Sequence, residues 1–113
     1  MNQFPEFMRR PANAVKQTSQ AGGLEGYVFD GADGSQVVIW QCAQGGRSEM
    51  DTHDFDEYAI VAQGTFAGTI GGRAITLGPG DEYFIPAGVP HDGEYSAGYR
   101  AIDAFGGKRV ERA

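Results

Sequence analysis

The chain has little of what several classes of protein require. Its single cysteine, Cys42, cannot form an internal disulfide, and no stretch approaches the roughly 20 apolar residues that span a bilayer. Residues 1–10 lack the apolar centre of a secretory signal peptide. Positive charge is also scarce, because 9 Lys and Arg stand against 15 Asp and Glu, and nucleic-acid binding needs clustered cations. We therefore expect a soluble cytoplasmic protein that binds neither a membrane nor a nucleic acid.

Glycine, by contrast, is abundant. The 113 residues include 18 glycines and 5 prolines, and 12% of them are aromatic, which is typical of short strands joined by tight turns. Apolar runs bounded by turn residues predict strands at residues 26–30, 36–43, 58–62, 66–70, 73–77, 82–85 and 100–105. With an eighth strand near residues 50–53, the sequence predicts one all-β domain built as a sandwich or barrel.

Two glycine turns support this interpretation. Gly71 and Gly72 separate two apolar runs, as in a two-residue hairpin turn that needs positive φ angles. Residues 78–81 place Pro and then Gly at the central positions of a type II turn.

The first twenty or so residues differ from the rest. Pro5 and Pro11 interrupt any sustained period, and Arg9 and Lys16 are among the few positive charges. We expect residues 1–23 to form an arm over the surface or over a partner, and residues 24–113 to form the domain. Because a small β-domain exposes sheet edges, this arm could pair with a second copy and make a homodimer.

Several metal-binding residue types lie at fixed distances from turn residues. Residues two apart on a strand point to one face, so Asp51 and His53 project together, and Glu49 shares their parity. Glu57 can return to the same pocket after a turn. Further along, a proline at position 90 restricts the residue before it to extended geometry, which fixes the approach of His91. These side chains predict a metal pocket inside the β-domain.

These residues resemble the paired motifs of the cupin superfamily. The chain carries the motifs as Gly45-x5-Asp51-x-His53-x3-Glu57-x6-Gly64 and Gly80-x5-Pro86-x-Gly88-x2-His91. The resemblance covers roughly residues 26–105 and implies a double-stranded β-helix, the jelly-roll barrel, that binds a divalent metal ion through His53, Glu57 and His91. The chain departs from the pattern at Asp51, where the family has its first His, and at Tyr95, where the second motif usually closes with Asn.

Asp51 leaves the ligand set open. Its carboxylate ends nearer the Cα than the distal nitrogen of an imidazole does, so it reaches less far towards an ion placed for His. The alternatives, in order, are direct coordination by Asp51, coordination through water, and substitution by the longer Glu49. A second carboxylate brings a divalent ion near zero net charge and weakens its Lewis acidity. Without Asp51, the set resembles the two-His-one-carboxylate triad of non-haem iron sites. Oxygen-rich ligation favours Fe, Mn or Zn over Cu, and affinity order does not select among the three.

The sequence leaves three functions open. The first is a small metalloenzyme that acts on a compact polar substrate, such as a sugar acid or hydroxy acid, by isomerase or lyase chemistry with Glu57 or Asp51 as base. The second is an Fe(II)-dependent dioxygenase, and the third is a non-catalytic module that binds or senses a small molecule. A metal-free cluster of the same side chains, held by hydrogen bonds, is the structural alternative. Arg47, Arg73 and Arg100 fit surface ion pairs better than a substrate carboxylate.

Overall fold

Nine β-strands dominate the part of the chain that the structure describes, residues 2–17 and 23–113 of a computed structural model. The elements follow the order η1 (Glu6–Met8), η2 (Pro11–Asn13), β1 (Glu25–Asp30), β2 (Gln36–Cys42), β3 (Gly46–Asp51), β4 (Glu57–Gln63), β5 (Phe66–Ile70), β6 (Arg73–Leu77), β7 (Glu82–Ile85), β8 (His91–Tyr95) and β9 (Tyr99–Phe105). Both η elements are short 3-10 helices, and no helix in the described residues is long and apolar enough to cross a membrane.

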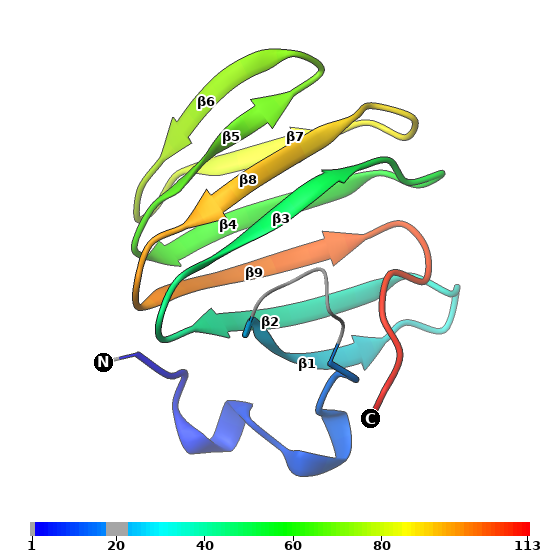
Figure 1. Cartoon of the computed structure of the whole chain (residues 1–113). Helices are drawn as coiled ribbons and strands as arrows, with labels where there is room; N and C mark the ends of the chain where they lie inside the picture. The colour runs from blue at the N-terminus through cyan, green and yellow to red at the C-terminus, as the bar shows by residue number, and fades with distance from the viewer. Residues whose placement is uncertain (1, 18–22) are drawn as a thin grey trace.

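The strands form two antiparallel sheets that pack against each other (Figure 1). One sheet has five strands in the order β1-β2-β9-β4-β7, and the other has four in the order β3-β8-β5-β6. Neighbours such as β2 and β9 are far apart in sequence, so the chain crosses repeatedly between the two layers. This arrangement confirms the predicted all-β fold, a double-stranded β-helix or jelly roll.

Strand positions agree closely with the sequence analysis. Seven predicted strands match to within one residue at each end, and the eighth is β3, which begins earlier, at Gly46. The sequence does not predict β8, because Pro90 and Gly93 both argue against a strand. Gly93 has a packing reason to be there: a Cβ at this position would lie 2.2 Å from the ring of Phe66 on β5. Close approach of a ring to the backbone, rather than a turn, explains this glycine.

Positive φ angles confirm the predicted glycine turns. Gly71 and Gly72 have φ of 57° and 79° and join β5 to β6. Gly80 has φ of 86°, and the Asp81 N–H donates to the Gly78 carbonyl across that turn at 3.0 Å. Other residues lose about 1–2 kcal/mol in this left-handed region, so glycine fixes the β5–β6 hairpin turn and the turn that takes the chain from β6 to β7 in the other sheet.

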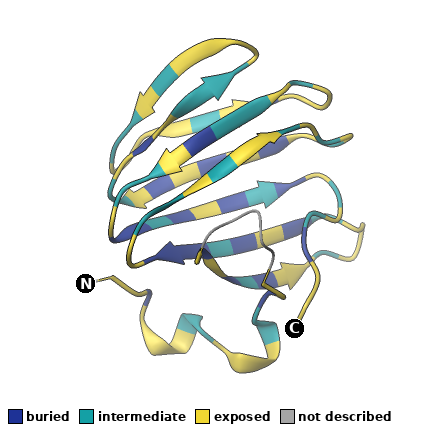
Figure 2. Ribbon diagram, viewed as in Figure 1, coloured by how far each residue is buried: buried dark blue, intermediate teal, exposed yellow. Residues whose placement is uncertain are grey.

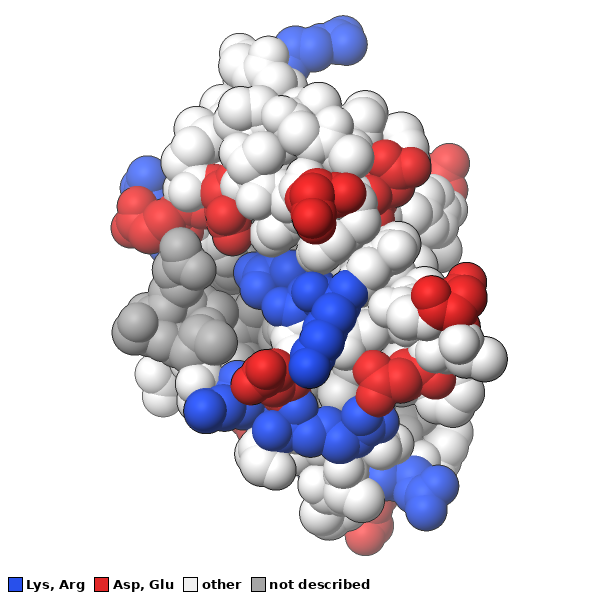
Figure 3. Space-filling view, turned by 90° about the vertical axis from the view of Figure 1, so that its right-hand side faces the viewer, with Lys and Arg blue, Asp and Glu red and all other residues white. Residues whose placement is uncertain are grey.

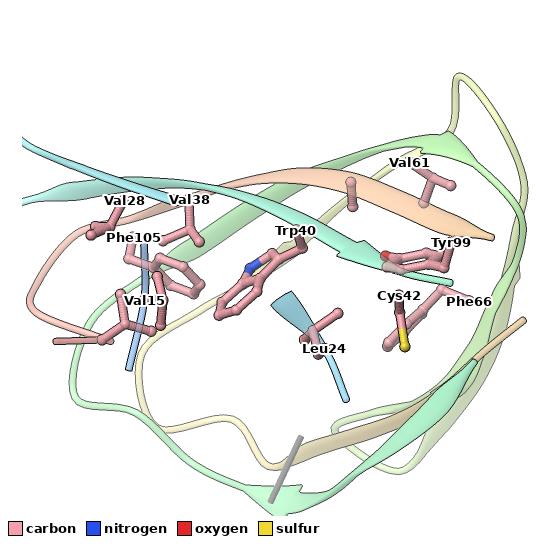
Figure 4. Close-up of a cluster of buried hydrophobic side chains, with 12 residues drawn as sticks. Val15, Leu24, Val28, Val38, Trp40, Cys42, Val61, Phe66, Tyr99 and Phe105 are labelled. Atoms are coloured by element: carbon pink, nitrogen blue, oxygen red, sulfur yellow. The ribbon is translucent and has the colours of Figure 1, made fainter. Parts of the chain in front are cut away.

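The core lies between the two sheets. β2 supplies Val38, Trp40 and Cys42 to it from one face, each at most 9% exposed, whereas Val37 on the other face is exposed. Figure 2 shows this alternation along the five-stranded sheet, and Figure 4 shows the inward side chains gathered with Phe105. Burial raises the pKa of the Cys42 thiol, which fits a small buried hydrophobe rather than a reactive group.

The N-terminal arm lies along the edge of its own sheet. Ala14 bridges to Tyr27 of β1, and Val15 bridges to Arg112 near the C-terminus. The Val15 N–H donates to the Gly26 carbonyl at 2.8 Å, and the Val15 side chain joins the core. The arm thus covers the β1 edge within one chain. The boundary between arm and domain after residue 23 stays a prediction.

Candidate metal centre

Three segments bring the candidate ligands together. Glu57 is the first residue of β4, and His91 is the first residue of β8, so the two come from different sheets. His53 lies in the connection between β3 and β4, where its carbonyl accepts the Gly88 N–H at 2.8 Å. Because this hydrogen bond joins the two motif segments, the loop that carries His53 is fixed against the turn that precedes His91.

The spacing of these side chains suits a metal ion. Nε2 of His53 and Nε2 of His91 each lie 3.8 Å from Oε1 of Glu57, and one ligand atom from each of the three lies within 4.8 Å of the others. A separation of 3.8 Å is longer than a hydrogen bond, which argues against a cluster held by hydrogen bonds alone. Two atoms bound about 2.0–2.2 Å from one ion lie up to roughly 4 Å apart. The group could therefore hold a divalent ion, whose identity the geometry does not select.

Hydrogen bonding and burial orient both imidazoles for metal binding. Nδ1 of His91 lies 3.0 Å from the Val89 carbonyl, which can only accept, so Nδ1 carries a proton and Nε2 is the nitrogen placed to coordinate. Burial, and then the positive charge of Arg109, lower the pKa of His53. The His53 ring also stacks on Phe55 with centroids 5.0 Å apart. Both imidazoles thus have a nitrogen free to coordinate.

A second buried carboxyl lies close to Glu57. Burial, and then the charge of Glu57, raise the pKa of Asp103 on β9 well above its usual range, while Tyr83 donates its OH to Oε2 of Glu57 at 3.4 Å. A divalent cation at Glu57 would offset this concentration of negative charge. Motif spacing misses Asp103, yet strand parity could have found it, because it lies two residues from both Ala101 and Phe105, on the same inward face of β9.

Asp51 lies beside the group without belonging to it. It pairs with His91 across β3 and β8 and lines the same cavity, but its carboxylate is not among the three that converge. Its Oδ1 accepts the Thr52 N–H at 2.8 Å. The register shifts between Ser48 and Asp51, so the strand parity that relates Glu49 to Asp51 is interrupted by this irregularity. Direct coordination by Asp51 and its role as a base stay predictions.

The candidate metal centre lines a cavity of about 80 Å³. Lys16 and Arg109 also line it, and the Arg109 guanidinium forms no ion pair with any residue in the ranges 2–17 and 23–113. The main-chain N–H groups of Arg109 and Val110 both donate to Oε1 of Gln36, at 2.7 and 3.0 Å, which fixes this segment. Figure 3 shows Lys and Arg side chains gathered near the middle of the face that carries the C-terminal segment. A free guanidinium at a cavity can bind an anionic group.

Two of the arginines singled out from the sequence bind other side chains and do not line the cavity. Arg47 pairs with Glu94 at 3.2 Å on the surface, as expected, and Arg100 donates to the Gln63 side chain at 3.0 Å. Arg109 belongs to no motif and follows β9 by only a few residues. Sequence reasoning misses it because only the fold brings the segment after β9 to the cavity.

The chain is similar in structure to several cupins. An RmlC-like cupin from Shewanella frigidimarina gives a TM-score of 0.76 at 23% sequence identity and covers 96% of each chain. KdgF from Halomonas sp. gives 0.70 at 22% identity, over 77% of this chain and 81% of that one. The polyketide cyclase RemF from Streptomyces resistomycificus gives 0.67 at 20% identity, over 93% of this chain and 77% of that one. These identities establish the fold and no activity, and no curated protein matches the chain.

Membership of a family comes from the sequence itself. The cupin domain family, Cupin_2, matches residues 38–97, more than half of the 113 residues. The matched stretch holds all three residues of the candidate metal centre and the strands from β3 to β8 that position them. The chain therefore belongs to the cupin domain family.

Proposed function

We propose that this cupin is a metal-dependent enzyme that acts on a compact carboxylate substrate, such as a sugar acid or hydroxy acid, by isomerase or lyase chemistry. One observation carries the proposal: His53, Glu57 and His91 converge at the wall of a cavity that Arg109 also lines. A bound divalent ion would supply Lewis acidity to polarise a substrate carbonyl. The cavity of about 80 Å³ is small beside drug-sized pockets of roughly 300–1,000 Å³, which favours a compact substrate.

Arg109 is the proposed anchor for the substrate carboxylate. A guanidinium binds a carboxylate through two parallel N–H···O bonds, which orients the substrate as well as holding it. The charge of Arg109 lowers the pKa of His53, so the charge of the guanidinium acts on the candidate metal centre. A substrate held there would present its reacting carbon toward the candidate metal centre, because catalysis needs the reacting atom held close to the group that acts on it.

Asp51 is the proposed general base. Glu57 belongs to the ligand group, whereas Asp51 lines the cavity beside it. One oxygen of Asp51 accepts the Thr52 N–H, which leaves the second oxygen able to take a proton from the substrate. Removal of a proton next to a polarised carbonyl is a step that isomerases and lyases share.

An Fe(II)-dependent dioxygenase is the second candidate. The observation that favours it is the composition of the converging group, two His and one carboxylate, which is the ligand set of non-haem iron oxygenases with open positions. A non-catalytic binding role is the third outcome and would use the same cavity. A cytoplasmic location and the absence of a nucleic-acid partner stay predictions.

Metal analysis of protein purified without chelators is the first test. We expect about one equivalent of Fe, Mn or Zn in the wild type, loss of the metal in Glu57→Gln, and retention in Glu94→Gln, an exposed carboxylate on the same strand as His91. Wild-type protein that binds no added divalent ion would contradict the proposal.

Activity assays then separate the reactions. Metal-loaded protein is offered a panel of uronates and 2-hydroxy acids, with oxygen uptake followed in parallel after addition of Fe(II). Turnover without oxygen uptake supports isomerase or lyase chemistry, and oxygen consumption supports the dioxygenase. An Arg109→Met variant should keep its metal and lose affinity for the carboxylate substrate. Metal binding with no turnover of any kind would leave the binding role.

A further inference from the structure

The outer face of the five-stranded sheet is apolar and uncovered. Six large side chains on this outer face are each between 37% and 67% exposed: Phe29, Val37, Tyr58, Ile60, Phe84 and Ile102. Monomeric soluble proteins rarely expose a contiguous apolar surface larger than a few hundred Å². Side chains of this size present on the order of 500 Å² at these exposures, a patch size that often marks an interaction surface.

Strand register arranges the outer face in two rows that cross all five strands. The first row is Phe29, Val37, Ala104, Tyr58 and Phe84, and the second is Tyr27, Ile39, Ile102, Ile60 and Glu82. Glu82 is the single charged member of the two rows, and it accepts a hydrogen bond from the Tyr58 hydroxyl. The rows therefore form a continuous surface with one charge, at its edge.

The N-terminal arm marks where this surface ends. The next row of the same sheet contains Gln41 and Arg100, which face each other across β2 and β9. Phe4 covers that row: its N–H donates to Oε1 of Gln41 at 2.9 Å, and the Arg100 guanidinium lies 5.1 Å from its ring centroid. The arm thus shields the polar third row and leaves the two apolar rows open.

We propose that a second copy of this chain docks on the outer face, sheet against sheet. With a net charge of −6, two copies repel each other over most of their surfaces, and the outer face is where that repulsion is weakest. The outer face is also self-complementary. A two-fold axis along β9 would set Phe29 against Phe84 of the partner copy and Val37 against its Tyr58, with the small Ala104 of both copies at the centre.

The area comes close to that of a stable dimer. A specific interface needs about 800 Å² from each partner, and the exposed side chains of the two rows, together with the half-buried Tyr27 and Ile39 and a polar rim, approach that value. The cavity opens from the interior between the sheets, so a partner on the outer face would leave it free. The proposal is thus independent of the metal chemistry.

A paired substitution tests the outer face directly. Phe29→Lys with Phe84→Lys alters two edge-strand residues that are 67% and 55% exposed, so we expect the fold to survive. It changes the net charge from −6 to −4, so dissociation could not come from a larger overall repulsion between copies, but only from lysines placed opposite each other in this interface. Light scattering over a dilution series should show a wild-type dimer and a dissociation constant raised at least about 100-fold in the variant, with metal content unchanged.

The matched control is Phe7→Lys on η1, which is 79% exposed but lies in the arm. We expect this variant to dimerise like the wild type. A wild type that stays monomeric at every concentration would overturn the proposal. A dimer that survives the paired substitution but dissociates in Phe7→Lys would overturn it as well, because the arm would then be the interface.

A cross-linking variant keeps the proposal testable if the lysine variant misfolds. Phe29→Cys with Phe84→Cys places thiols on the two opposite edge strands, where they cannot pair within one chain. Cys42 is buried and does not compete. Facing sheets lie about 10 Å apart, too far for a direct disulfide, so a bismaleimide of about that length should trap a covalent dimer across the two-fold axis. Exclusively monomeric product in a dimeric sample would contradict the sheet-against-sheet arrangement.

Discussion

The two ends of the interior are built on the same strands and differ in chemistry. At one end, β4 and β9 carry Glu57 and Asp103, both of them buried. At the other end, the same two strands carry Val61 and Tyr99, packed in the hydrophobic core. Because the strands pair along their length, neither sheet pairing nor burial distinguishes the two ends. Position along the strand alone separates the group that could bind metal from the residues that stabilise the fold.

This separation has an energetic consequence. Buried carboxyls disfavour the folded state unless they are paired or hydrogen-bonded, and Oδ1 of Asp103 has no hydrogen-bond partner among the described residues. The apolar end must supply the stability that the polar end lacks. A cation bound at Glu57 would offset the buried negative charge at the polar end and leave the packing of the apolar end unchanged. Substitutions at the polar end should therefore change metal affinity, and substitutions at the apolar end should change the free energy of unfolding.

Removal of a ligand should have the largest effect. Structural zinc sites gain about 10–16 kcal/mol from four ligands, so one ligand contributes roughly 3 kcal/mol. Glu57→Gln should therefore lower metal affinity about 100-fold to 1,000-fold, while the metal-free protein keeps its stability or gains some, because a buried charge is removed. Competition with a fluorescent chelator measures the first quantity and denaturant unfolding the second. Unchanged affinity would remove Glu57 from the ligand set.

Core truncation at the opposite end should reverse this pattern. Val61 is 1% exposed, and Val61→Ala deletes two buried methyl groups, which should cost about 2 kcal/mol of unfolding free energy. Metal affinity should stay within about twofold of the wild type, since sites this far apart without shared partners behave additively. Urea unfolding and the chelator assay measure the two quantities. Coupled losses in both would show that the two ends of the interior are not independent.

The fold was largely predictable because local signals agreed with it. Gly71 and Gly72 could form a two-residue turn at positive φ, and the apolar runs beside them had strand length. β8 was not predictable in the same way. Gly93 weakens its strand signal and is explained only by the ring of Phe66 on the neighbouring strand, a contact that the sequence does not show.

The candidate metal centre was predictable only in part. The motif spacing, through its resemblance to the cupin pattern, was enough to predict that His53, Glu57 and His91 converge. Asp103 and Arg109 come from β9 and the segment after it, and reach the same cavity only through the pairing of β9 with β4. No local pattern in the sequence encodes that pairing, so the spacing of the motifs does not predict which residues it brings to the cavity.

A smaller effect should appear in the pH dependence of the metal-free protein. Burial and the charge of Glu57 raise the folded pKa of Asp103, so above the unfolded pKa of about 4 the folded state retains a proton that the unfolded chain has released. Stability should therefore fall as pH rises from about 4 towards the folded pKa. Asp103→Asn should flatten this slope and raise the midpoint of thermal unfolding at the alkaline end. Parallel profiles in the two proteins would contradict the assignment.

The smallest expected effect concerns a hydroxyl pair at the cavity wall. Ser48 and Tyr95 hydrogen-bond to each other, and burial raises the pKa of Tyr95 to about 12. Ser48→Ala leaves the tyrosine hydroxyl without its partner and should cost about 1 kcal/mol, whereas the double variant with Tyr95→Phe removes both polar groups and should recover most of that loss. Tyr58→Phe, on the outer face, is the matched control for deleting a tyrosine hydroxyl. Neither Ser48 nor Tyr95 belongs to the converging group, so the chelator assay should read the same in all these variants. A loss of metal in the double variant would extend the polar end of the interior along β8, from His91 to Tyr95.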